Sequence, residues 1–178
     1  AKRDEYDARG LTHVTVSTLH ARAYQASFDL HGGRIADSLE LTGSLLASLT
    51  DTSALDWPLS RRDAVRDAIA RFAASRDVVP DERHLEVDSS DGGIVHAARA
   101  VWLASCSGQG TIPTTHDLYL KLCQLDADRR AAMFHGVDVV LLDEAQDCTE
   151  ADFSLVEDTA GRSWASLLVY DFRQRIYG

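Results

Sequence analysis

Residues 137–147 read VDVVLLDEAQD. Six mostly apolar residues, 137–142, come first and two acids follow directly, a pattern typical of a strand that is buried on both faces of a parallel sheet. A second apolar run, 166–170, also ends in an acid, Asp171, and residues 149–159 between the two runs have helical spacing. Strand, helix and strand predict a βαβ unit whose site lies at the carboxyl ends of the strands.

The composition sets limits on the class of protein. The 178 residues are 45% hydrophobic, enough for the core of one domain with a modest insertion. No apolar run approaches the roughly 18 residues of a membrane span, and the first residues lack the pattern of a signal peptide. Cys106, Cys123 and Cys148 have no Cys-x-x-Cys spacing, which argues against a disulfide framework and a zinc site. We therefore expect no membrane partner, no secretion, and a cytoplasmic, nucleoid-associated or nuclear location.

The net charge of −10 argues against a separate basic DNA-binding domain, because such domains draw most of their affinity from Lys and Arg. A motor protein can still bind a strand across several subdomains, so the basic groove can lie on other parts of the protein. The scattered histidines predict no metal cage of nitrogen and sulfur ligands. The pattern does not exclude a metal that is held by carboxylates and phosphates.

Before the quoted stretch, the hydrophobic spacing predicts a mainly helical chain that begins with a strand over 13–18. A capping-box pattern at residues 60–63 marks one helix start. Glycine, serine and proline clusters predict loops over 78–93 and 105–113. The expected helices cover 19–27, 35–49 with a kink at Gly43, the residues from 60 to 72, 94–104, a segment capped by Thr114 or Thr115 and reaching Leu125, and a segment beginning at Asp126.

Asp143 and Glu144 are the acids at the end of the first predicted strand. In P-loop ATPases the first acid after such a strand binds Mg²⁺, which prefers oxygen ligands, and the next acid positions or deprotonates the attacking water. This pattern makes Asp143 the metal ligand and Glu144 the catalytic base. The plain alternative for an Asp-Glu pair is a solvated acidic turn.

A second motif, residues 170–178, reads YDFRQRIYG and follows the next predicted strand. In this order, DEAQD and D-x-x-Q-x-I-Y resemble motifs II and III of the UvrD/Rep family of superfamily 1 DNA helicases. The resemblance implies a RecA-like P-loop NTPase domain that uses ATP and Mg²⁺. It also implies that Gln174 senses the γ-phosphate and that Gln146 and Asp171 belong to the ATP site. Tyr177 would then lie in the segment that contacts DNA.

A third similarity lies near the start of the chain, where residues 16–21 read VSTLHA. This stretch resembles the Thr-x-His segment of the same family, which implies that Thr18 and His20 contact single-stranded DNA. A threonine that caps a helix is the structural alternative. His116 and Tyr119 lie in a stretch similar to the F-box DNA helicase branch and are weaker DNA candidates, because a tyrosine at helical spacing is more often a core residue.

In family terms, residues 1–30 and 113–178 would belong to the RecA-like domain and residues 31–112 to an inserted helical subdomain. Two departures from the family pattern matter. Tyr170 stands where the family usually has glycine, and the chain contains no GxxxxGKT stretch to bind the phosphates. We therefore expect the chain to be an internal fragment that does not hydrolyse ATP alone.

The resemblance implies a 3′ to 5′ DNA helicase or translocase, with DNA repair as a family-level expectation. Its partners would be single-stranded DNA, junctions of single- and double-stranded DNA, and the rest of the helicase: the Walker A segment and a second RecA-like domain. Two alternatives stay open. One is a degenerate DNA-binding or scaffold module without hydrolysis, and the other is a Mg²⁺-dependent nuclease that uses Asp143, Glu144 and Asp171.

Overall fold

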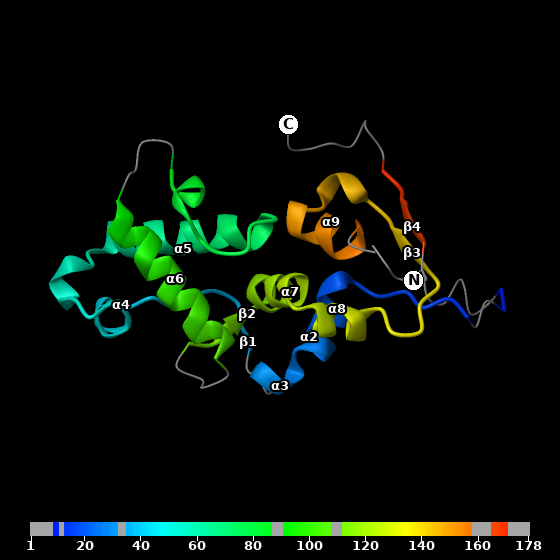
Figure 1. Ribbon diagram of the computed structural model, residues 1–178, viewed down its shortest axis with the longest axis horizontal. Helices are drawn as coiled ribbons and strands as arrows, with labels where there is room; N and C mark the ends of the chain where they lie inside the picture. Colours follow the sequence, from blue (N-terminus) through cyan, green and yellow to red (C-terminus); the bar gives the residue numbers. More distant parts are fainter. Residues whose placement is uncertain are drawn as a thin grey trace.

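Two small parallel sheets are set into a mainly helical chain in the computed structural model (Figure 1). The structure describes residues 9–10, 13–31, 35–86, 91–107, 112–157 and 165–170. The strands are β1 (Ile35–Ala36), β2 (Thr114–Thr115), β3 (Val139–Leu142) and β4 (Ala165–Leu168). The helices are α2 (Leu19–Ala26), α3 (Phe28–His31), α4 (Gly43–Thr50), α5 (Leu59–Ala74), α6 (Gly92–Cys106), α7 (His116–Leu125), α8 (Ala127–Met133) and α9 (Glu150–Glu157), with 3₁₀ turns η1 (Ala54–Asp56), η2 (Glu82–His84) and η3 (Ala145–Asp147).

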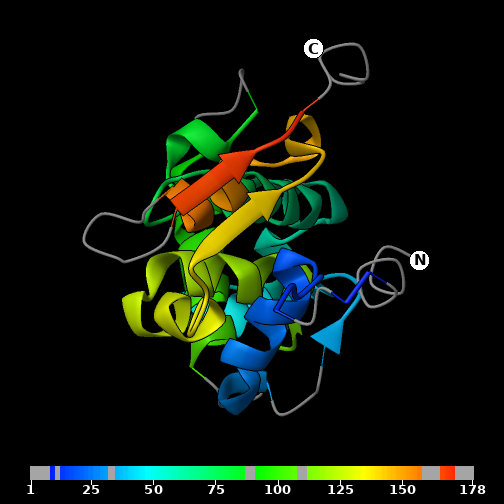
Figure 2. The same ribbon diagram turned by 90° about the vertical axis from the view of Figure 1, so that its right-hand side faces the viewer.

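Strands β3 and β4 pair in parallel with α9 between them in sequence, as the βαβ pattern predicts. The expected burial on both faces is wrong for the described part of the chain. Val139, Leu141 and Leu167 share one face of the sheet and are 56%, 63% and 56% exposed. Figure 2 shows the two strands side by side with helices only behind them. The opposite face is partly covered, because Val140 packs against buried residues of the helices.

The second sheet joins two segments that are distant in sequence. Ile35 of β1 pairs with Thr114 of β2, and Ala36 pairs with Thr115. The helices α4, α5 and α6 all lie in the chain between these two strands, on the left in Figure 1. The division into 1–30, 31–112 and 113–178 stays a prediction, and the β1–β2 pair lies close to both of its boundaries.

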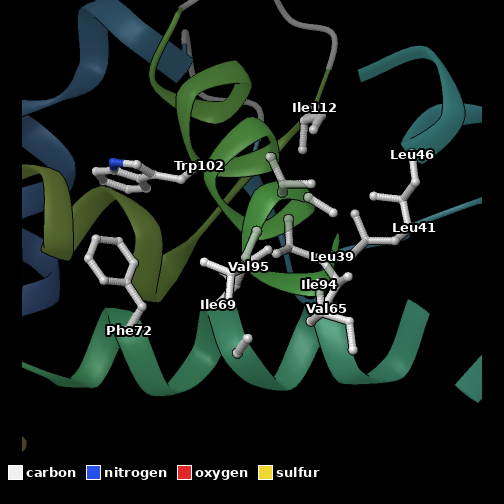
Figure 3. Close-up of a cluster of buried hydrophobic side chains, with 14 of the residues drawn as sticks. Leu39, Leu41, Leu46, Val65, Ile69, Phe72, Ile94, Val95, Trp102 and Ile112 are labelled. Carbon is white, nitrogen blue, oxygen red and sulfur yellow. The ribbon is translucent and has the colours of Figure 1, made fainter. Parts of the chain in front are cut away.

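The buried apolar side chains form two clusters. The first, which we name the insertion cluster, fills the space between α4, α5 and α6. Figure 3 shows side chains of α5 and α6 pointing toward one another, with the Phe72 and Trp102 rings edge to face at a centroid distance of 5.2 Å. Burial of each such large side chain contributes about 1.5–3 kcal/mol. Members of the insertion cluster labelled in Figure 3 are Leu39, Leu41, Leu46, Val65, Ile69, Phe72, Ile94, Val95, Trp102 and Ile112.

The second cluster, named the body cluster, lies between α2, α7, α8 and α9. Helix α7 contributes to both clusters, because Leu118 packs into the insertion cluster while Tyr119 and Leu120 pack into the body cluster. Helix α7 thus lies between the two clusters and packs against both of them. The buried members of the body cluster are Ala23, Tyr119, Leu120, Cys123, Met133, Phe134 and Leu155.

Two predicted elements are wrong. No strand forms over the described residues 13–18, where the chain is irregular and ends in the extended residue Thr18 before α2. A helix does not run through 35–49, because α4 begins only at Gly43 after Thr42, whose hydroxyl accepts from the Leu45 amide. Leu39 and Leu41 are buried while the residues after each are exposed, so this stretch has the two-residue period of extended chain.

Of the predicted helix starts, the one at residues 60–63 is wrong and the one at Asp126 is confirmed. The capping box at residues 60–63 is wrong, since α5 begins at Leu59 after Pro58, and within the described residues no side chain caps this end. Proline before the first turn suits its fixed φ. Asp126 does begin a helix, and its carboxylate accepts from the amides of Asp128 and Arg129. The expected helices over 19–27, 94–104 and 149–159 correspond to α2, α6 and α9.

Candidate functional site

The acidic motif lies at the carboxyl end of β3, beside the end of β4. Asp143 follows the last strand residue directly, and both it and Glu144 are exposed. The Val169 amide donates to the Leu142 carbonyl at 2.8 Å, and the Ala145 amide donates to the Val169 carbonyl at 3.0 Å. These two bonds hold the acidic turn against the end of β4, the edge where the sequence places the site.

Glu144 has an unusual backbone. Its φ of 54° lies in the left-handed region, which costs a non-glycine residue roughly 1–2 kcal/mol. The Glu144 amide donates to Asp143 Oδ1 at 3.2 Å, and Glu144 Oε2 accepts from Gln146 Nε2 at 2.6 Å. The strained turn therefore carries two successive exposed carboxylates, the kind of oxygen ligand that Mg²⁺ prefers, and the Gln146 amide orients the second of them.

The rest of the predicted nucleotide site cannot be compared with this geometry. Asp171, Gln174 and Tyr177 lie outside the described residues, so their places relative to Asp143 stay predictions. Tyr170, the last residue that the structure describes, is 51% exposed.

Two of the DNA candidates, distant in sequence, lie together. The His20 ring of α2 and the His116 ring of α7 have centroids 6.4 Å apart. Tyr119 Oη is hydrogen-bonded to His116 Nδ1 at 2.9 Å, and the Tyr119 side chain is buried, as a core residue would be. Thr18 caps α2, since its Oγ1 accepts from the Ala21 amide at 3.1 Å. The capping alternative is therefore present in the structure, whereas DNA contact by Thr18, His20 and His116 stays a prediction.

Asp117 belongs to the same group, and the sequence reasoning missed it. His20 Nε2 lies 3.6 Å from Asp117 Oδ1, so the two form an ion pair when the imidazole is protonated. The Asp117 carboxylate raises the pKa of His20, against the opposing effect of burial, and His20 lowers the pKa of Asp117. The signal was an acid directly after His116, in the first turn of a predicted helix.

A cluster that resembles a metal site lies elsewhere, at the end of α5. Asp77, Asp81 and His84 place one ligand atom each within 4.8 Å of one another. The buried His84 ring is already satisfied, because Nδ1 accepts from the Asp81 amide at 3.0 Å and Nε2 donates toward Asp77 Oδ2 at 3.1 Å. Arg83 pairs with both carboxylates. These contacts describe a buried histidine held in place, remote in sequence from the predicted magnesium ligand Asp143.

Lys121 is a second residue that the sequence reasoning missed. Its side chain is fully buried, Nζ donates to the Ser75 carbonyl at 2.7 Å, and it lies 4.4 Å from the centroid of the Phe72 ring. Burial lowers the pKa of Lys121 to about 8. Ser75 ends α5, so this lysine joins the insertion cluster to α7.

Among the described residues, no helix has both the length and the apolar character that a membrane span requires. Comparisons with protein-family models, with curated proteins and with solved structures found no match.

Proposed function

We propose that this chain is part of an ATP-dependent DNA helicase or translocase of the UvrD/Rep type. The observation that carries the proposal is the acidic turn at the carboxyl end of β3, held against the end of the parallel strand β4. Ligands of open α/β sheets bind at that edge.

In the proposed reaction, Asp143 binds the Mg²⁺ of ATP and Glu144 acts on the attacking water. Magnesium neutralises charge on the β- and γ-phosphates when it is bound. Gln146 Nε2 donates to Glu144 Oε2 at 2.6 Å and so orients the carboxylate, whose other oxygen, Oε1, would accept a proton from the attacking water. Gln146, Asp171 and Gln174 complete the site by the resemblance.

The exposed face of the sheet supports a partner that completes the domain. Parallel strands are normally covered on both faces, whereas Val139, Leu141 and Leu167 are more than half exposed here. A contiguous apolar face of this kind marks an interaction surface. The proposed cover is the rest of the same helicase, including the Walker A segment that supplies the phosphate-binding loop and, across the nucleotide, the second RecA-like domain.

Single-stranded DNA is the proposed second ligand. His20 and His116 offer ring N–H groups to phosphate or sugar, and Thr18 lies at the start of the same helix. Tyr177 is assigned to the same strand by the resemblance. The net charge of −10 means that phosphate neutralisation by this chain is small and that other parts of the motor provide most of it.

ATP hydrolysis by the full-length protein, with and without single-stranded DNA, tests the proposal. Glu144→Gln keeps the shape of the turn and removes the base, so we expect turnover to fall by at least about 100-fold while ATP still binds. Gln174→Ala should lower DNA stimulation. The matched control is Glu150→Gln, an exposed glutamate at the start of α9, which should leave turnover unchanged.

Other outcomes identify the alternatives. A wild-type protein that binds DNA without ATP turnover would instead be a non-hydrolysing DNA-binding or scaffold module. Mg²⁺-dependent cleavage of DNA without ATP, lost in Glu144→Gln, would replace the motor by a nuclease.

A further inference from the structure

An open cavity lies between the turn η2 and helix α6. Its volume is about 460 Å³, within the range of roughly 300–1,000 Å³ that is usual for ligand sites. Figure 1 shows α6 in the left half of the molecule and β3 and β4 at the right end, so the cavity is separate from the acidic turn at Asp143. The cavity is lined by Asp81, Glu82 and Arg83 from the η2 side and by Gly92, Val95, His96 and Arg99 from α6.

Arg99 is anchored at this cavity while its charge is unmatched. Its Nε donates to the Pro80 carbonyl at 2.7 Å, which fixes the guanidinium beside the start of η2. The terminal amino groups of Arg99 form no hydrogen bond or ion pair within the part of the chain that the structure describes. Two parallel N–H donors of this kind match the two oxygens of a carboxylate. His96 lies one turn earlier on the same side of α6 and adds a ring nitrogen.

The η2 side of the cavity carries an unmatched acid. Glu82 is exposed, and among the described residues its carboxylate has no hydrogen-bond or ion-pair partner. The neighbouring Asp81 differs, because Arg83 bonds to its carboxylate at 2.6 Å and lowers its pKa. Arg83 also pairs with Asp77 at 3.0 Å. The cavity therefore presents two unmatched charges of opposite sign, Arg99 and Glu82, from two different elements.

An exposed stripe continues from the cavity along α6. Its members recur every three or four residues, which is the spacing of one side of a helix, while most residues between them are buried in the insertion cluster. Leu103 differs from the rest of the stripe, because it is a large apolar side chain and is 67% exposed one turn beyond Arg99. The exposed members are Gly92, His96, Arg99, Leu103 and Ser107.

The cavity and the stripe together, which we name the α6 surface, match a peptide better than a small molecule or a nucleic acid. A ligand that contacts both His96 and Leu103 extends over about 10 Å of the helix axis, and it must combine an acid, a base and an apolar group. Neighbouring side chains of a peptide provide this combination. A nucleic-acid strand carries one phosphate per nucleotide and no cation, so it would leave Glu82 facing like charge.

We propose that the α6 surface binds a segment of a partner protein in which an acidic, a basic and an apolar side chain lie close together. The acid bonds to Arg99, the base pairs with Glu82, and the apolar side chain covers Leu103. Charge complementarity sets the direction of the segment, because the reversed direction brings like charges together. This inference goes beyond the proposed function and does not depend on it.

Selection of displayed random peptides on the full-length protein tests the proposal. Peptides that bind wild type are kept, and those that also bind Arg99→Glu are removed. Two residues of an extended peptide span about 6.6 Å, close to the rise of about 6 Å between Arg99 and Leu103 on the helix. We therefore expect the remaining peptides to share an Asp or Glu two positions from a large apolar residue, with a Lys or Arg nearby.

Fluorescence anisotropy with one such labelled peptide measures each contact. Arg99→Ala should weaken binding by about 10- to 100-fold, because a hydrogen bond between charged groups is lost, and Glu82→Gln and Leu103→Ala should weaken it less. The matched control is Arg22→Ala, since Arg22 of α2 likewise bonds to a backbone carbonyl, that of Met133, and this variant should bind the peptide as wild type does.

Charge exchange separates a direct contact from a loss of folding. A peptide with Lys in place of its acid should bind Arg99→Glu more tightly than it binds wild type, a reversal that an unfolded variant cannot produce.

Three results would overturn the inference. Enriched peptides without a shared acidic motif would show that the α6 surface selects no such segment. Equal peptide affinity of wild type and Arg99→Ala, at equal melting temperatures, would show that the acid binds elsewhere. Displacement of the peptide by a DNA oligonucleotide, together with direct binding of that oligonucleotide lost in Arg99→Glu, would make the surface a nucleic-acid contact instead.

Discussion

Lys121 is a cation enclosed between two apolar cores. A buried ammonium group is costly unless its donors are satisfied, and here Nζ bonds to the Ser75 carbonyl and lies against the Phe72 ring. Ser75 ends α5, where the helix dipole is negative, so the dipole offsets part of the cost of burying the positive charge. The lysine therefore fastens α7 to the end of α5.

Replacing Lys121 by methionine should change how stability depends on pH. The folded pKa of about 8 lies below the ordinary value of 10.5, so the unfolded chain binds more protons than the folded one between these values. This lysine thus makes the free energy of unfolding rise as the pH increases from about 8 to 10.5. Urea unfolding at pH 7 and pH 10 should show a smaller rise in Lys121→Met than in wild type, and equal rises would refute the burial of the charge.

Asp117 should control the ionisation of His20. Because the carboxylate raises the pKa of His20 and the imidazole lowers the pKa of Asp117, the pair stabilises the fold fully between the ordinary values of 3.8 and 6.5. This stabilisation is lost as the pH rises through the folded pKa of His20 and as it falls through the folded pKa of Asp117. Asp117→Asn should lower the pKa of His20 in an NMR titration. Asp128→Asn, an exposed acid at the start of α8, should leave it unchanged. An unchanged His20 titration in Asp117→Asn would contradict the pairing.

Among the elements, helices with a clear cap and a single apolar side were predictable. Asp126 and the residues after it are an example, since the carboxylate satisfies two amides of the first turn. The structure of residues 35–49 was not predictable, because the leucines fit both the two-residue spacing of extended chain and the spacing of a helix. Leu39 and Leu41 face inward from extended chain, and Leu46 faces inward from α4. Only the packing of this stretch against α5 and α6 decides which part is extended and which part is helical.

Helix α7 shows a second limit of sequence reasoning. Its apolar positions face two different cores, so they do not form one stripe. The spacing of apolar residues along such a helix predicts that a lysine is exposed even where it is buried. The burial of Lys121 depends on α5 and α9, which both contact α7 and also contact each other, so it is a tertiary effect.

At the scale of the whole molecule, the sequence predicted where the acidic turn lies, and it did not predict which residues surround the DNA candidates. The strand context and the two acids located the turn at Asp143 and Glu144. The approach of His20 to His116, and the role of Asp117 beside them, depend on how α2 packs against α7. No local pattern encodes a contact between segments so far apart in the chain.

The uncovered sheet face predicts the behaviour of the intact protein. Leu141 is 63% exposed, so it would contribute little if nothing covered it. If further parts of the proposed helicase pack on this face, Leu141→Ala in the full-length protein should lower the free energy of unfolding by about 2–4 kcal/mol. Leu55→Ala, at a position that is 91% exposed, is the control and should cost less than about 0.5 kcal/mol. Equal small effects of both variants, in chemical denaturation, would show that the face remains open.

The pairing of α2 with α7 also has a consequence during synthesis of the chain. Helix α2 ends at Ala26 and α7 begins at His116, so the ribosome must add the residues of α4, α5 and α6 before the partner of α2 exists. At the usual rate of translation this interval is on the order of ten seconds. The insertion cluster can begin to form from neighbouring helices during that interval. The Ala23 side chain and the aromatic side chains of α2 stay exposed to solvent until α7 has been synthesised. A nascent chain of this protein should therefore present α2 to chaperones until α7 emerges.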